Sequence, residues 1–159
     1  MSERYEPKSD FLRAVIAEEA PLSGGELAEA NLRLLVKMTS DPDLSNRDWA
    51  TFLLAQEDTD TDAIRTALIR ASEDENEFVR AEAVLGLAKR DPSLALPLVQ
   101  KALKADSVVF AMFQAAEYCA HPSLIEDLRR WTEPSGEPFL DSRATDALTA
   151  CESGVRPEC

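Results

Sequence analysis

The chain has 159 residues, of which 45% are hydrophobic and only five are glycine, a composition typical of a folded domain rather than of a disordered chain. Its formal net charge is -13, with 17 Lys and Arg against 30 Asp and Glu, which is the opposite of a nucleic-acid-binding surface. No apolar run approaches the roughly 18 residues that a membrane span needs and no secretory signal begins the chain, so we expect one cytoplasmic domain, residues 1–159.

The first predicted helix pair occupies residues 9–40. Apolar residues recur at helical spacing from Ser9 to Ala20 and again up to about Met38. Ser23 and Glu26 have the spacing of a capping box, in which the Glu side chain bonds back to the Ser N–H, so they predict where the second helix begins.

The second predicted pair occupies residues 41–72, with helices over Ser45–Gln56 and Asp62–Ser72. Asp62 is expected to be the N-cap of the later helix, because a carboxylate can accept a hydrogen bond from a free N–H there. The expected packing residues are Trp49, Phe52, Leu53, Ile64, Leu68 and Ile69.

The third predicted pair occupies residues 73–105, where an apolar helix, a turn with Pro92 and a second helix follow one another. Proline is tolerated in a first helical turn, and Ser93 can accept a hydrogen bond from a free N–H, so both predict the start of the second helix. Gly86 weakens the first helix, and we expect that it is needed for close packing of another helix.

The fourth predicted pair occupies residues 106–132, with helices over Ser107–Ala120 and Ser123–Trp131 and a second capping box at Ser123 and Glu126. A loop rich in Pro and Gly follows. A partial repeat, residues 139–152, then supplies one more helix, which is expected to cap the end of the structure.

The helix pairs resemble one another in sequence. Residues 80–88 align with residues 47–55, thirty-three positions earlier, and with residues 143–151, sixty-three positions later. A hairpin of two amphipathic helices cannot bury both of its faces alone, and stacking on copies of itself solves that problem. Periods of about 30–45 residues built from helix pairs indicate a helical solenoid, here of about four pairs plus a C-terminal capping helix.

The start Val79-Arg80-x-x-Ala83, Gly86 and the Asp91-Pro92 turn resemble HEAT repeats, in particular the short HEAT-like repeats of phycobilisome-lyase-related proteins. The resemblance implies an all-α, right-handed α-solenoid. That family includes scaffolds, adaptors, chromophore lyases and proteins that repair alkylated DNA, so the resemblance is informative about the fold and much less so about the function.

Two sets of residues are candidates for binding a partner. The second helices carry basic residues that would make the concave surface suitable for an acidic peptide or a phosphate-bearing ligand, unless they only stabilise helix C-termini by about 0.3–1 kcal/mol each. The candidates among them are Arg65, Lys101, Arg129 and Arg130. The helix with Phe110, Met112 and Phe113 is apolar all round, so Phe139 and Leu140 cover it or a protein partner, including a second copy in a homodimer, binds there.

Arg47, Arg80 and Arg143 recur at one repeat position. They form either an array of anion-binding groups or a structural ladder in which each guanidinium bonds to a neighbouring repeat. Recurrence in every copy is what stacking requires, so we favour the ladder.

No set of residues predicts catalysis, a metal or a cofactor. His121 is the only histidine and is expected in a turn, while Cys119 and Cys151 are expected to be buried thiols. The leading hypothesis is a non-catalytic scaffold that binds a protein. The alternatives are a lyase or chromophore-handling enzyme with Cys119, Cys151 and Glu117, an acidic immunity-type protein that masks a basic partner, and a DNA-repair enzyme using Trp131 and Asp127, which the net charge disfavours.

Overall fold

A computed structural model describes residues 5–158, so the extreme ends of the predicted domain lie outside the described residues. Within residues 5–158 the chain forms nine α-helices and one short 3-10 helix, with no β-strand. In chain order the elements are α1 (Asp10–Ile16), α2 (Glu26–Met38), α3 (Leu44–Gln56), α4 (Asp62–Ala71), α5 (Glu77–Arg90), α6 (Pro92–Ala102), α7 (Phe110–Cys119), η1 (Pro122–Leu124), α8 (Ile125–Trp131) and α9 (Pro138–Ser153).

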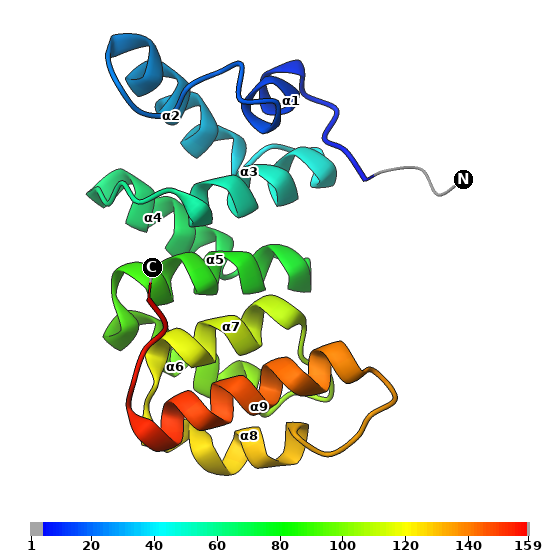
Figure 1. Ribbon diagram of the computed structural model, residues 1–159. Coiled ribbons are helices and arrows are strands. Elements are labelled where there is room, and N and C mark those ends of the chain that lie inside the picture. The colour runs from blue at the N-terminus through cyan, green and yellow to red at the C-terminus, as the bar shows by residue number, and fades with distance from the viewer. Residues whose placement is uncertain (1–4, 159) are drawn as a thin grey trace.

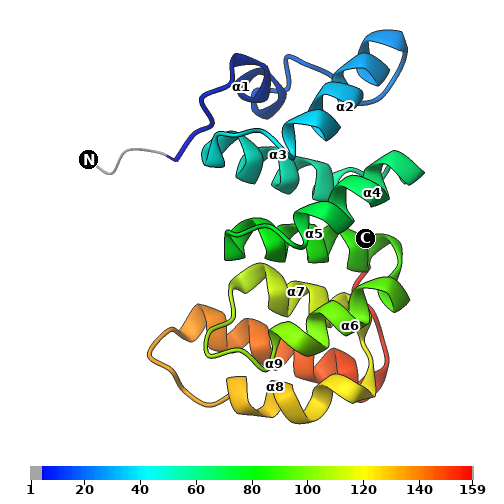
Figure 2. The same ribbon diagram turned by 180° about the vertical axis from the view of Figure 1, so that it is seen from behind.

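The helices are stacked in two layers, as Figures 1 and 2 show from opposite sides. Helices α3, α5, α7 and α9 follow one another in the first layer, each packed against the next. The second layer contains α4, α6 and α8, which pack on α5, α7 and α9 respectively. This arrangement is an α-solenoid that ends in a capping helix, as the sequence predicts.

The core runs continuously along the stack because each first helix is buried by both of its neighbours. In α5 every residue from Ala83 to Ala88 is buried. Gly86 lies against α3, and a Cβ atom at this position would come within 3.0 Å of the Cβ and 3.1 Å of the Cα of Ala55. Since a backbone atom cannot move aside as a flexible side chain does, close packing accounts for this glycine, as expected.

Several helix starts differ from those predicted. The N-cap of α4 is Thr61, whose hydroxyl accepts from the Ile64 N–H at 3.2 Å, so Asp62 is the first residue of the helix. The N-cap of α6 is Asp91, because Pro92 occupies the first helical position and moves the cap one residue ahead of it. The prediction of Ser93 in that role was wrong.

The two predicted capping boxes are not formed. Helix α2 begins after Gly25, which has a φ of 120° and no side chain that could cap. At the start of η1 the ring Nδ1 of His121 accepts from the Ser123 N–H at 3.1 Å, so the histidine takes the capping role predicted for the serine. In both places the residue at the N-cap lies two positions away from the serine that the capping box would use.

Three other boundaries moved. Helix α1 ends at Ile16 because Glu18 adopts a left-handed conformation with a φ of 61°. Helix α7 begins at Phe110 rather than Ser107. Helix α9 begins at Pro138, one residue before the predicted partial repeat, so Phe139 lies in its first turn. Two residues expected on packing faces, Phe52 and Ile69, have more than a third of their surface exposed.

Candidate functional site

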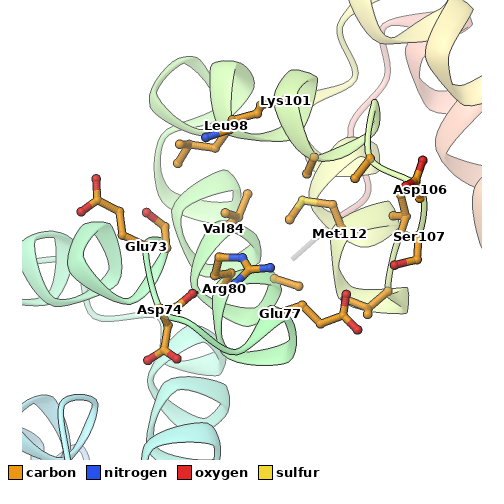
Figure 3. Close-up of a pocket in the computed structure, with 16 residues that line it drawn as sticks. Glu73, Asp74, Glu77, Arg80, Val84, Leu98, Lys101, Asp106, Ser107 and Met112 are labelled. Carbon is orange, nitrogen blue, oxygen red and sulfur yellow. Dashed lines mark hydrogen bonds between the residues drawn. The ribbon is translucent and has the colours of Figure 1, made fainter.

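A groove of about 630 Å³ opens between the α4–α5 turn, α6 and the α6–α7 turn (Figure 3). Its floor is apolar, formed by Ala81 and Val84 of α5, Leu98 of α6 and Met112 of α7. Arg80 lies in the middle of the opening in Figure 3. The rim is charged and carries Glu73, Asp74, Glu77, Lys101 and Asp106.

Repeated arginines hold the turns together next to this groove. The Nη1 atom of Arg47 donates to the carbonyl oxygen of Asp41 at 3.1 Å. Its Nε and Nη2 atoms donate to the two carboxylate oxygens of Asp74 at 2.6 and 3.3 Å. Because the two side chains are only 13% and 10% exposed, this bidentate ion pair joins two successive helix pairs in a largely water-free setting.

The equivalent ion pair is missing at Arg80, thirty-three positions later. Its Nη1 atom still donates to the carbonyl oxygens of Asp74 and Glu75, at 2.7 and 3.0 Å. No carboxylate within residues 5–158 lies within ion-pair distance of its guanidinium. The residue that corresponds to Asp74 in the next repeat is Ser107, whose hydroxymethyl group carries no charge.

The start of α7 departs from the repeat in a second way. In α5 the side chain of Asn76 caps the helix, and Asp74 accepts from the Asn76 N–H at 2.9 Å. In α7 the N-cap position holds Val109, which has no polar side chain, and Ser107 replaces the aspartate. The groove therefore opens at the place where two stabilising features of the repeat have been lost.

The third arginine of the series has a different partner. Arg143 Nη1 lies 3.0 Å from a carboxylate oxygen of Glu117, and its guanidinium carbon lies 5.1 Å from the ring centre of Phe110. Glu117, a candidate for the lyase alternative, is thus engaged in an ion pair between α7 and α9.

Two of the predicted basic residues are engaged within the protein. Arg65 pairs with Asp60 at 2.7 Å and with Asp91 at 3.2 Å. Arg130 donates to carbonyl oxygens in the turn that follows α6, and its guanidinium carbon lies 4.5 Å from the ring centre of Trp131. Both side chains therefore stabilise turns.

The other two are free of such contacts in the part of the chain that the structure describes. Lys101 is exposed on the rim of the groove, and Arg129 is exposed on α8 outside it. The structure thus brings Lys101 together with Arg80, a pairing that the sequence analysis did not make. The signal was available, since an aspartate precedes Arg47 and Arg80 by six positions whereas Ser107 interrupts that series.

The apolar residues predicted for partner binding are largely covered. Phe113 is 1% exposed and Met112 is 6% exposed, although Met112 borders the groove. The ring of Phe110 stacks on that of Phe139 with a centroid distance of 5.0 Å and an interplanar angle of 1°. Of this group only Phe139, which is 74% exposed, presents a large apolar surface to solvent.

The side chains considered for chemistry are in unreactive surroundings. Burial raises the pKa of the Cys119 thiol to about 12 and that of Cys151 to about 11, so both thiols are protonated near neutral pH. Asp127 pairs with Lys104 at 2.7 Å, and the Trp131 indole donates to the carbonyl oxygen of Leu103, the residue after α6. Among the described residues no cluster of three or more His, Cys, Asp or Glu is arranged to hold a metal ion.

Comparison with known proteins places this geometry in a family. A profile of HEAT repeats matches residues 32–117, more than half of the chain. The chain belongs to the HEAT-repeat family. Such repeats commonly mediate interactions between proteins, so a protein-interaction scaffold is the general function that the family suggests.

The relatives are longer proteins. Protein YibA of Escherichia coli strain K12 and Protein YibA of Escherichia coli O157:H7 are each 32% identical to this HEAT-repeat chain over 88 residues, which is 55% of this chain and 31% of theirs. The match thus spans about a third of their length. The X-ray structure of the Escherichia coli YibA protein aligns with a TM-score of 0.61 over 87% of this chain and 54% of that chain, and at 22% identity this likeness concerns the fold. No helix within residues 5–158 is both long enough and apolar enough to cross a membrane.

Proposed function

We propose that this HEAT-repeat protein is a non-catalytic interaction module that binds a segment of a protein partner in the groove beside Arg80. The observation that supports the proposal is the loss of the repeat pattern at Ser107 and Val109, on the wall of the groove. A repeat protein loses stability when it gives up an ion pair and a helix cap, and such local departures are expected where a surface serves binding.

The chemistry of the groove indicates what its occupant carries. The Nε and Nη2 atoms of Arg80, which correspond to the atoms of Arg47 that bind Asp74, remain available for a carboxylate. The apolar floor suits an aliphatic or aromatic side chain next to that carboxylate. Because Glu73, Glu77 and Asp106 on the rim repel further negative charge, we expect one acidic group flanked by neutral or basic residues rather than an acidic run.

The groove can be blocked without disturbing the core. Ala105 lines the groove and is exposed, and Ala30 is an exposed alanine on α2 outside it. Ala105→Trp fills the groove, whereas Ala30→Trp adds the same side chain elsewhere. Immobilised wild-type protein and both variants are incubated with a lysate of the source cells, and the retained proteins are compared by mass spectrometry.

We expect at least one protein to be retained by the wild type and by Ala30→Trp and to be lost from Ala105→Trp. That protein, once purified, should bind the three forms in the same order. If Ala105→Trp retains every protein that the wild type retains, the groove is not the docking surface and the proposal is wrong.

A further inference from the structure

A second, smaller pocket lies on a different face of α5 from the groove. It has a volume of about 210 Å³ and is walled by four aromatic rings, those of Tyr5, Trp49, Phe52 and Phe78. Two carboxylates, Asp48 and Glu82, complete it. Trp49 and Glu82 occupy equivalent positions in successive repeats, thirty-three residues apart, which explains why they meet when α3 and α5 stack.

The aromatic rings of this pocket are unusually exposed. Tyr5 and Phe78 are each 55% exposed and Phe52 is 38% exposed. Trp49 stacks on Tyr5 with a centroid distance of 6.3 Å and meets Phe52 edge-on at 5.7 Å. Large apolar side chains gathered at a surface, with no cover among the described residues, mark a binding site more often than a stabilising feature.

Two buried polar atoms of residues that line the pocket have no hydrogen-bond partner within the described residues. The Oε2 atom of Glu82 is buried and accepts no hydrogen bond, and the Nε1 atom of Trp49 is buried and donates none. Asp48, by contrast, accepts from the Tyr5 hydroxyl at 3.0 Å. Since a buried polar group without a hydrogen bond is unfavourable, a ligand that brings a hydrogen-bond donor to Glu82 and an acceptor to Trp49 would be stabilised there.

The electrostatics of the pocket favour positive charge. Burial, and after it the negative charge of Asp48, raises the pKa of Glu82 to about 7, and burial also raises the pKa of Asp48. Lys89 acts on Glu82 in the opposite direction, yet its ammonium group is engaged with Gln56 at 3.1 Å. A cation placed between the two carboxylates would remove the cost of their ionisation, and the overall charge of -13 attracts cationic ligands to the protein.

We propose that the pocket formed by Tyr5, Trp49, Phe52, Phe78, Asp48 and Glu82 binds the cationic side chain, lysine or arginine, of a basic protein partner. Aromatic rings attract organic cations through their faces, and a carboxylate at the base of such a cage pairs with the ammonium or guanidinium group. Peptide carbonyl groups next to that side chain supply the acceptor for Trp49. At 210 Å³ the pocket is smaller than the roughly 300 Å³ at which small-molecule sites begin, so it suits a single side chain.

The proposal concerns a different surface from the groove and does not depend on it. Its test uses the two tryptophan indole N–H signals in the proton–nitrogen NMR spectrum of the full chain. Trp49 reports on the pocket, and Trp131, which donates to the Leu103 carbonyl oxygen at 2.9 Å, is the internal reference. The probes are the N-acetyl methylamides of lysine and arginine, and the control is that of norleucine, which has a similar aliphatic side chain without charge.

We expect the Trp49 signal to move saturably with the lysine or the arginine probe, or with both, while the Trp131 signal stays in place. Norleucine should bind at least tenfold more weakly. In Glu82→Gln, which keeps the shape of the side chain and removes its charge, and in Phe78→Leu, which removes an exposed ring, the affinity for the cationic probe should fall at least tenfold.

The pH dependence gives a readout that a merely structural role would not produce. With the pKa of Glu82 near 7, its ionised fraction rises roughly tenfold between pH 6 and pH 8, and the affinity for the cationic probe should rise by a similar factor. In Glu82→Gln that rise should disappear, although Asp48 and Lys89 are still present. The proposal is overturned if norleucine moves Trp49 as strongly as lysine and arginine do, if neither cationic probe moves it, or if Glu82→Gln binds as the wild type does.

Discussion

The missing ion pair at Arg80 can be rebuilt by one substitution, Ser107→Asp. An aspartate at position 107 corresponds to Asp74, which accepts from two nitrogens of Arg47 at 2.6 and 3.3 Å. It would face the Nε and Nη2 atoms of Arg80, and it would also be placed to accept from the N–H of Val109, as Asp74 accepts from Asn76. The variant should therefore be more stable than the wild type.

The magnitude follows from these contacts. Hydrogen bonds to charged groups contribute about 1.5–3 kcal/mol, and a negative charge at a helix N-terminus adds about 0.3–1 kcal/mol. Repulsion from Glu77 and Asp106 and the desolvation of the new carboxylate oppose this gain. We expect a net stabilisation of about 1–2 kcal/mol, which corresponds to an increase in Tm of about 2–8 °C for a domain of this size.

The assay is urea denaturation of four proteins that form a double-mutant cycle: wild type, Ser107→Asp, Arg80→Met and the double variant. A matched control, Ser107→Asn, can accept the same hydrogen bond from the Val109 N–H as the aspartate but carries no charge. The coupling between positions 80 and 107 should be about 1 kcal/mol or more. If Ser107→Asp stabilises the protein equally when Arg80 is absent, or if Ser107→Asn gives the same gain, then the ion-pair reasoning is refuted.

Three further predictions concern the same stack. Arg47→Met should destabilise the protein by about 3 kcal/mol in urea denaturation, because it leaves the nearly buried carboxylate of Asp74 without its cation; a loss below 1 kcal/mol would contradict this account. Gly86→Ala should lower the unfolding free energy by a net of about 1–2 kcal/mol, and the Tm with it, despite the better helix propensity of alanine, since the new methyl group meets the backbone of Ala55; an increase in Tm would show that the helices can separate. For Glu82, whose pKa is about 7 in the folded state against an ordinary 4.5, the associated stability is complete below about pH 4.5 and is lost as the pH rises through 7. Between pH 5 and 8 the unfolding free energy of the wild type should therefore fall relative to Glu82→Gln by up to about 3 kcal/mol, and parallel curves would contradict the raised pKa.

The fold was predictable because the repeat itself carries the information. Apolar residues recur at helical spacing, and a period of thirty-three residues relates Arg47 to Arg80 and Trp49 to Glu82. A single helix pair exposes an apolar face, so such a series has to stack. The order of the helices and the position of the capping helix follow from this requirement, without any knowledge of individual contacts.

Helix caps were less predictable, since they depend on one or two backbone angles. The spacing of Ser23 and Glu26 fits a capping box, but Gly25 with a φ of 120° begins the helix instead. At Asp91-Pro92 the proline occupies the first helical position, so the cap is Asp91, two residues earlier than Ser93. The side-chain pattern is compatible with several first residues for a helix, all within one helical turn, and tertiary packing selects one of them.

The candidate sites were harder to predict because each depends on residues distant in the chain. The apolar run at Phe110 has one meaning if Phe139 covers it and another if nothing does, and only the path of the chain between them decides. The aromatic pocket contains Tyr5, which is forty-three residues from Asp48, its hydrogen-bond partner. The repeat period gives no information about where segments outside the repeats, such as the one with Tyr5, will pack.

Several arginines of the stack donate hydrogen bonds to backbone carbonyl groups and are therefore not available to bind a partner. Arg90 is 4% exposed and donates to three carbonyl groups in the last turn of α3 and the loop after it, while Arg156 donates to the carbonyl groups of Ala88 and Tyr118. Arginines that satisfy helix C-termini in this way contribute little positive charge to the surface. The exposed surface is therefore more acidic than a simple count of charges implies, and the groove offers a carboxylate-bearing partner Arg80 and Lys101 together. A basic partner meets fewer restrictions, and the pocket at Glu82 gives its side chain a defined place to bind.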